Sequence, residues 1–199
     1  MTSESVLTSI DEVVESGRTV ISGDSSIVMD MVEEAMQKGT TIDAVVESGR
    51  TIISGDSAIV MGLLQEAVQK GTILTFYVPR SQFDPIMRQI WTPERIKEAK
   101  MESVSKEETD RIERELEVPC EGEILVTRLE CPCGDEYGAF EFMQQGIRTH
   151  GKDWMNGVIG LKKAAIIRAN PSNNPICPKC KQALATAFCY SWCGYYSCC

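Results

Sequence analysis

A duplication near the start of the chain constrains its fold more than any other feature of the sequence. Residues 10–40 recur at 42–72, an offset of 32, and 23 of the 31 aligned positions are identical. A unit this short cannot bury an apolar face by itself, so we expect the two copies to pack together.

Each copy is predicted to form two short amphipathic helices joined by a Gly-Asp turn. In the first copy the apolar residues from Ile10 to Ile21 are spaced to share one helical face. A second apolar stripe follows the turn, with Asp24 or Ser25 as its N-cap. The alternative is a strand at 18–22 (RTVIS), but helical spacing fits more of the residues. We therefore expect four short helices in the two copies.

The sequence as a whole predicts an α+β chain that is divided into three segments. A duplicated helix-hairpin domain at 1–78 would dock a protein partner, and a charged helical connector would follow at 79–118. A small, β-rich domain that holds all nine cysteines would occupy 119–199. The apolar run 73–78 (ILTFYV) is typical of a buried strand. In the connector, Thr92 is placed to cap a helix that begins with proline.

The chain carries nine cysteines, and the compartment decides how they are interpreted. No run of about 18 apolar residues is present, so no membrane span is predicted. Residues 1–17 contain acids where a signal peptide needs a basic region before an apolar run. We therefore expect a cytoplasmic protein in a reducing compartment, where clustered cysteines bind metal more often than they form disulfides.

Two tight cysteine turns organise the last third of the chain. Each turn, CPCG at 131–134 and CPKC at 177–180, is expected to lie between two strands. The flanking strands are expected at 123–129 and 137–143 for the first turn, and at 164–168 and 183–190 for the second. Cysteines this close aim both sulfurs at one point, and Gly134 permits the left-handed backbone that often follows the second ligand. The two motifs resemble the zinc-ribbon class, in which two cysteine turns clamp one ion. The resemblance implies a structural Zn²⁺ site made of Cys131, Cys133, Cys177 and Cys180.

The first turn has one residue between its cysteines instead of two, and 43 residues lie between Cys133 and Cys177. A rival assignment therefore closes a local finger with Cys177, Cys180, Cys189 and Cys193. Cys131 and Cys133 would then join Cys120, Cys198, Cys199 or His150 in a second metal site. If the two turns share one ion instead, the candidates for a second site are Cys120, Cys189, Cys193, Cys198, Cys199 and His150.

Charge is divided unevenly along the chain. Residues 1–136 carry 13 basic and 27 acidic side chains, whereas residues 137–199 carry seven basic and two acidic ones. Aromatic residues gather in the basic part, and this combination is typical of surfaces that bind single-stranded nucleic acid. The candidate contacts are Arg148, Lys152, Lys162, Lys163, Trp192 and Tyr196.

No catalytic constellation accompanies the cysteines, because the chain lacks a Ser/His/Asp set and a phosphate loop. The sequence favours a non-catalytic zinc-binding adaptor or regulatory protein. One alternative is a thiol redox enzyme that uses Cys177 and Cys180 or the tail cysteines. The tail at 188–199 (FCYSWCGYYSCC) also resembles the core-peptide end of class II lantibiotic precursors, which implies a ribosomally made peptide precursor.

Overall fold

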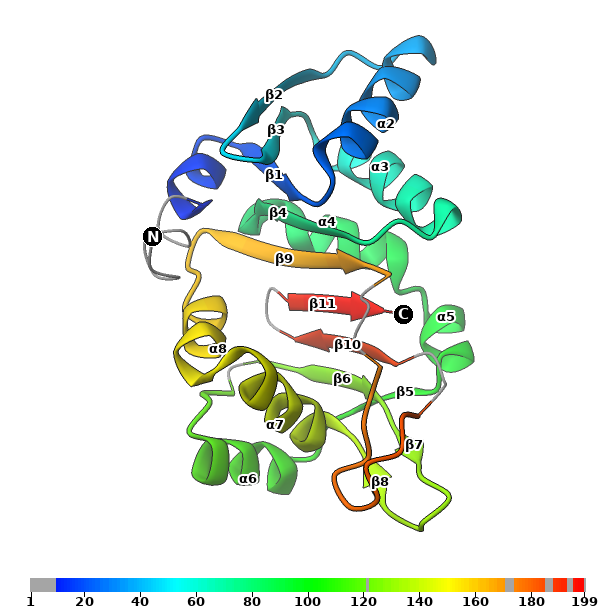
Figure 1. Ribbon diagram of the computed structural model, residues 1–199, viewed down its shortest axis with the longest axis vertical. Helices are drawn as coiled ribbons and strands as arrows, with labels where there is room; N and C mark the ends of the chain where they lie inside the picture. Colours follow the sequence, from blue (N-terminus) through cyan, green and yellow to red (C-terminus); the bar gives the residue numbers. More distant parts are fainter. Residues whose placement is uncertain (1–9, 121, 171–173, 185–187, 193–194, 199) are drawn as a thin grey trace. The chain divides into compact units, whose positions relative to one another are not determined.

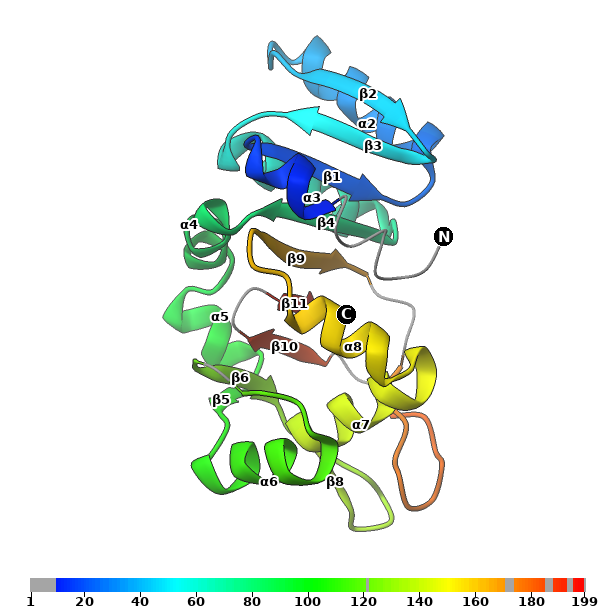
Figure 2. The same ribbon diagram turned by 90° about the vertical axis from the view of Figure 1, so that its left-hand side faces the viewer.

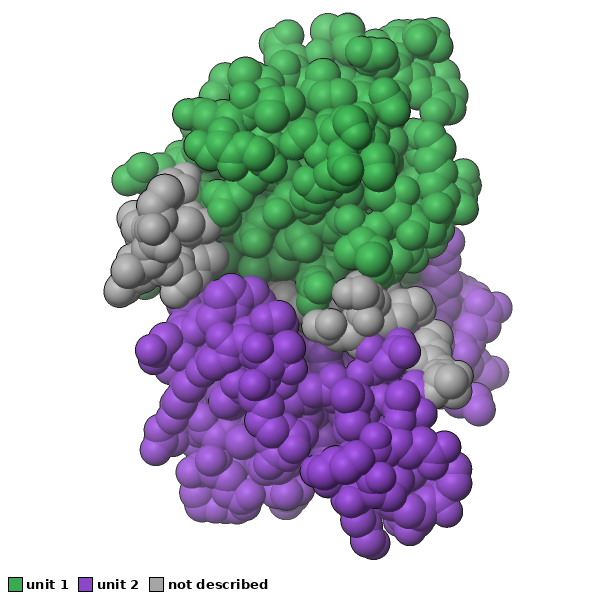
Figure 3. Space-filling view, in the orientation of Figure 1, with its two compact units in different colours: residues 1–91, 161–171 green, residues 92–160, 172–199 purple. Residues whose placement is uncertain are grey.

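A computed structural model describes residues 10–120, 122–170, 174–184, 188–192 and 195–198, with residues 192 and 195–198 described as backbone only. Two compact units, coloured separately in Figure 3, make up the chain. Unit 1 comprises Met1–Trp91 and Leu161–Pro171, and unit 2 comprises Thr92–Gly160 and Ser172–Cys199.

The structure mixes α and β elements, and its sheets are antiparallel. The two units cut across the three predicted segments, since residues 79–91 belong with unit 1. No helix in the described part of the chain has the length and apolar character needed to cross a bilayer.

Unit 1 contains a five-strand sheet with helices on both faces. After a helix at 10–15, its elements are β1 (Arg18–Ser22), α2 (Ser25–Gln37), β2 (Asp43–Glu47), β3 (Arg50–Ser54), α3 (Ser57–Lys70), β4 (Leu74–Pro79), α4 (Arg80–Ile90) and β9 (Ala164–Ala169) (Figure 1). The strands lie in the order β2-β3-β1-β4-β9, and every neighbouring pair is antiparallel. Figure 2 shows helix 10–15 in front of β1, with α2 and α3 behind the strands.

Unit 2 has a smaller antiparallel sheet with the order β11-β10-β6-β5 and a separate two-strand pair, β7-β8. Its elements are α5 (Pro93–Glu98), β5 (Met101–Ser103), α6 (Lys106–Leu116), β6 (Ile124–Thr127), β7 (Leu129–Glu130), β8 (Glu136–Tyr137), α7 (Ala139–His150), α8 (Lys152–Ile159), β10 (Cys189–Trp192) and β11 (Tyr195–Cys198).

The second helix of each repeat is confirmed. Asp24 accepts a hydrogen bond from the backbone N–H of Ser26 at 2.9 Å and so caps α2. Asp56 caps α3 in the same way through Ala58, also at 2.9 Å. The predicted strand at 73–78 is present as β4. Each repeat therefore presents a Gly-Asp turn whose aspartate satisfies amide groups that the first helical turn leaves free.

The prediction of four helices in the repeats is wrong, because 18–22 and 50–54 are strands β1 and β3. Both strands are buried on both faces; Ile21 and Ile53 are 0% exposed. A strand covered on both sides shows a continuous apolar run without alternation of apolar and polar residues. Periodicity alone does not distinguish such a run from a buried helical segment.

Near-identical segments at 10–17 and 42–49 adopt different structures. The first forms helix 10–15, whereas the second forms β2 and a turn that leads into β3. In the turn, Ser48 and Gly49 both have positive φ, 52° and 74°, as a two-residue type I′ hairpin requires. The equivalent hairpin cannot form in the first copy, because β1 already pairs with β3 on one side and β4 on the other.

Replacing Ser48 with asparagine is expected to raise the free energy of unfolding by about 0.5 kcal/mol, because asparagine tolerates the left-handed conformation of an Asn-Gly type I′ turn. Ser16 is the matched control: it holds the same place in the first repeat but lacks a positive φ. Urea unfolding of Ser48→Asn and Ser16→Asn should show a gain only for the first. Equal effects at both positions would contradict the structural difference between the copies.

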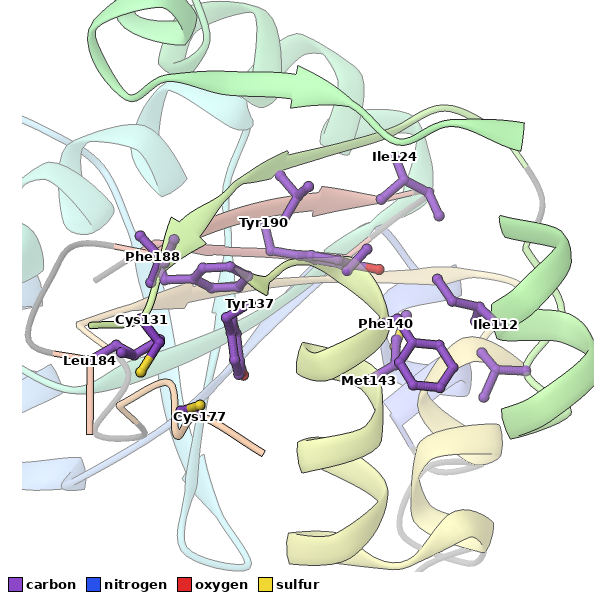
Figure 4. Packing of buried hydrophobic residues seen from close by; sticks show 14 of the residues in the cluster. Ile112, Ile124, Cys131, Tyr137, Phe140, Met143, Cys177, Leu184, Phe188 and Tyr190 are labelled. Atoms are coloured by element: carbon purple, nitrogen blue, oxygen red, sulfur yellow. The ribbon is translucent and has the colours of Figure 1, made fainter. Parts of the chain in front are cut away.

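The core of unit 2 packs helix α7 against the sheet. The Phe142 ring stacks on Tyr190 with centroids 4.5 Å apart, and Tyr137 meets the edge of Phe188 at 5.2 Å. Figure 4 shows Cys131 and Cys177 in the same buried cluster, beside Leu184. The core of unit 2 therefore reaches the two cysteine turns.

Candidate metal centre

The first cysteine turn lies between the short antiparallel strands β7 and β8. Gly134 donates its N–H to the carbonyl of Cys131 at 2.8 Å, and Cys131 donates its own N–H to the carbonyl of Asp135 at 2.8 Å. Gly134 has a φ of 83°, which confirms the left-handed conformation expected after the second cysteine. These bonds close the turn and direct the sulfurs of Cys131 and Cys133 to the same side.

The second turn repeats this pattern with a different residue at the left-handed position. Lys181 donates its N–H to the carbonyl of Cys177 at 3.0 Å, and Cys177 donates to the carbonyl of Gln182 at 3.0 Å. Lys181 directly follows Cys180 and has a φ of 64°. The sequence did not indicate this conformation, because lysine, unlike glycine, gives no local signal of it.

The two turns bring four thiols to one point. The Sγ atoms of Cys131 and Cys180 are 3.4 Å apart, and those of Cys133 and Cys177 are 3.7 Å apart. All four sulfurs lie within 4.8 Å of one another. Figures 1 and 2 both show the two turns side by side, although Cys133 and Cys177 are 44 positions apart in the sequence. This cluster can hold a metal ion.

Backbone amides prepare one of the thiols for ligation. The N–H of Cys180, and then that of Lys179, favour the thiolate of Cys177 and lower its pKa to about 7, although burial acts in the opposite direction. The N–H of Cys133 likewise favours the Cys131 thiolate, but burial and the neighbouring thiols outweigh it and raise the pKa of Cys131 to about 12. A divalent cation displaces such protons, so metal binding to this cluster releases them.

Gln145 on α7 fixes the second turn to the core of unit 2. Its Oε1 accepts hydrogen bonds from the Tyr137 hydroxyl and the N–H of Ile176, each at 2.9 Å. Its Nε2 donates to the carbonyl of Asn174 at 2.9 Å. Nothing in the sequence singles out Gln145, since a helical glutamine far from any cysteine belongs to no recognisable motif.

Of the strands expected around the cysteine turns, one is absent and another pairs elsewhere. The segment 137–143 (YGAFEFM) was expected to form a strand, but it enters helix α7 at Ala139. The strand at 164–168 exists as β9 but pairs with β4 in unit 1. In the described part of the second turn, pairing is limited to a bridge between Ile176 and Ala183. Two full hairpins around the cysteines are therefore not found.

Replacing Lys181 with glycine is expected to stabilise the second turn by about 0.5 kcal/mol, because relief of the left-handed strain exceeds the entropy that glycine adds to the unfolded chain. Gly134→Ala is the reciprocal control and should destabilise by about 1 kcal/mol. Thermal unfolding and competition with a metal chelator would measure both. A loss of stability in Lys181→Gly would show that the hydrogen bond from Lys181 Nζ to the carbonyl of Pro178 stabilises the turn by more than the left-handed strain costs.

The described members of the proposed second metal site are not brought together. In the part of the chain that the structure describes, the cluster of four cysteines is the one group of three or more metal-binding side chains. Cys120 is half-buried, and burial followed by the nearby Glu113 raises its pKa to about 11. Cys189 is disulfide-bonded, and the His150 ring packs on Trp154 at 4.6 Å. The side chains of residues 193, 198 and 199 lie outside the description.

The candidate nucleic-acid contacts fall in both units. Lys152 donates to a Glu117 carboxylate in unit 2, and Lys163 donates to Glu15 at 2.8 Å in unit 1. Lys162 adjoins Lys163 in unit 1, Arg148 is on α7 in unit 2, and the side chains of residues 192 and 196 are not described.

Comparison with protein-family models, with curated proteins and with solved structures finds no match for this chain. The metal-binding geometry of the four cysteines therefore carries the functional argument.

Proposed function

We propose that the four-cysteine cluster is a structural zinc centre. The observation that carries this proposal is the mutual approach of the four sulfurs, with separations of 3.4 and 3.7 Å for two pairs. A tetrahedral zinc with Zn–S bonds of about 2.3 Å places its sulfur ligands about 3.8 Å apart. Sulfur-only donor sets favour Zn²⁺ over Mg²⁺ or Ca²⁺, which take oxygen ligands.

The closed ligand set supports a non-catalytic role. Four protein ligands complete the zinc coordination and leave no position for water or substrate, unlike a catalytic zinc site. The ion would clamp the segment of Cys177 and Cys180 onto the core that contains Cys131. We propose that the protein is an adaptor or regulatory protein in which zinc stabilises the folded structure of unit 2.

A protein partner agrees better with the charge pattern than nucleic acid does. Two of the six candidate nucleic-acid contacts, Lys152 and Lys163, have carboxylate partners within their own units. The whole chain carries a net charge of −9, which repels phosphate. We further propose a reducing, cytoplasmic compartment, where the four thiols stay free for metal and the disulfide at Cys189 would be open.

Metal analysis tests the zinc proposal directly. Protein purified without chelator should contain one zinc per chain. Replacement by Co²⁺ should give the visible bands of a tetrahedral site with four thiolates. Less than about half an equivalent of metal at saturation, or a cobalt spectrum of octahedral oxygen coordination, would overturn the proposal.

Alkylation distinguishes this structural site from the thiol redox alternative. A structural site should label slowly until a chelator removes the metal, because bound thiolates are poor nucleophiles. A redox dithiol should label fast at neutral pH whether or not zinc is present, since its thiolate must stay reactive.

A further inference from the structure

The outer edge of the unit 1 sheet is an exposed strand. Strand β2 ends the strand order of this sheet, and among the described residues it pairs only with β3. Val45 and Val46 are 49% and 48% exposed on its two faces. Edge strands with free backbone groups are templates for pairing with another chain.

The hairpin geometry fixes which backbone groups of β2 point outward. In a two-residue hairpin the residues that flank the turn exchange hydrogen bonds with each other, and such pairs then alternate along the strands. Glu47 faces Arg50 across the turn, so Glu47, Val45 and Asp43 bond to β3. The N–H and C=O groups of Ala44 and Val46 therefore face the free edge.

Acidic side chains lie at both ends of this edge. Asp43 and Glu47 are exposed on the same face of the strand as Val45, and no ion pair joins either of them to a described residue. Antiparallel pairing of two copies about Val45 would place each Asp43 against a second acid. Like charges directly opposite each other destabilise a strand pair, so this edge disfavours a second copy of the chain in the register that pairs β2 along its whole length.

We propose that β2 binds an extended segment of a partner protein that has apolar residues flanked by lysine or arginine. The partner would add an antiparallel strand through the backbone groups of Ala44 and Val46. Its basic residues would lie opposite Asp43 and Glu47, and its apolar residues would cover Val45 and Val46. This inference deepens the proposed docking role and does not depend on the zinc centre.

Two synthetic peptides test the partner chemistry on the full chain. Thr-Arg-Val-Ile-Val-Arg-Thr places its arginines opposite Asp43 and Glu47, and Thr-Glu-Val-Ile-Val-Glu-Thr is the matched acidic control. We expect the basic peptide to bind at least about tenfold more tightly at low salt, with a difference that shrinks as salt screens the charges. On binding, the amides of Ala44 and Val46 should become protected from hydrogen exchange in NMR spectra.

Blocking the backbone should abolish this binding. Val46→Pro removes an N–H that β3 does not use, and proline is tolerated at such edge positions. A basic peptide N-methylated at the residues that would donate to β2 gives the same test with the protein unchanged. Equal affinity for the two original peptides, undiminished binding of the N-methylated peptide, or protection of Ala44 and Val46 by self-association would each overturn the proposal. If the zinc content of the same samples is normal, any of these outcomes would overturn the peptide-binding proposal and leave the zinc proposal standing.

Discussion

Replacing Cys177 with serine is expected to abolish stoichiometric metal binding and to destabilise unit 2 by several kcal/mol. The side chain is 1% exposed in the unit 2 core, and its sulfur lies 3.7 Å from that of Cys133. Structural zinc supplies roughly 10 kcal/mol or more of folding free energy in small domains. The extensive core of unit 2 limits the observed loss to a part of that value. Zinc content and thermal unfolding of the purified variant would measure both effects.

Cys120→Ser is the matched control for this variant. Cys120 is a half-buried free thiol in the same unit, and it does not belong to the four-cysteine cluster. We expect it to keep full metal content and to change the free energy of unfolding by less than about 1 kcal/mol. Full zinc content in Cys177→Ser, or metal loss in Cys120→Ser, would show that the ligand set is wrong.

Replacing Arg128 with methionine is expected to destabilise unit 2 by about 2–3 kcal/mol, because it leaves three carboxylates without their shared cation. Arg128 donates to Glu102, Glu108 and Glu136. Burial disfavours its charge, but the hydrogen bonds that Arg128 donates to Glu108, Glu136 and Glu102 outweigh burial and raise the pKa of Arg128. Methionine preserves much of the packing of the aliphatic stem.

The position of Glu108 explains why Arg128 should contribute more to the free energy of unfolding than an arginine in a surface ion pair does. Its side chain is 14% exposed, and it also accepts the N–H of Phe140 at 3.2 Å, in the first turn of α7. Arg114→Met is the control: Arg114 pairs with Glu115 and is 66% exposed, so we expect a loss below about 0.5 kcal/mol.

Denaturant unfolding would measure the two arginine variants, and neither should change the zinc content. Adding Glu136→Gln to Arg128→Met should restore part of the lost stability, because it removes one of the repelling charges. If Arg128→Met and Arg114→Met lose the same free energy of unfolding, the contact of Arg128 with three carboxylates stabilises unit 2 no more than a surface ion pair does.

Local chemistry let the sequence predict several features correctly. The aspartates at 24 and 56, the strand after the second repeat, and the left-handed Gly134 each depend on a few neighbouring residues. The four-cysteine cluster was one of two assignments that the sequence left open: the resemblance to zinc ribbons favoured it, whereas spacing alone also allowed a local finger at Cys177, Cys180, Cys189 and Cys193. The structure brings Cys131, Cys133, Cys177 and Cys180 together.

Sequence periodicity failed where burial is continuous. Strands β1 and β3 are covered on both faces, so they lack the alternation that marks a half-exposed strand. The segment 137–143 contains aromatic residues typical of strands, yet it enters α7, where Phe140 and Met143 are buried in the unit 2 core. Tertiary packing overrides such propensities, which amount to about 1 kcal/mol across the whole strand scale.

The two copies of the repeat separate what the sequence determined from what only the tertiary structure decided. The sequence determined the Gly-Asp turn and the helix that follows it, which appear in both copies. Residues 10–17 and 42–49 differ only at Glu12 and Ala44, yet one begins as helix 10–15 and the other forms β2. The difference arises because β1 pairs on both sides, whereas β3 had one edge left for β2. A strand has only two edges, and which of them is open depends on the whole sheet.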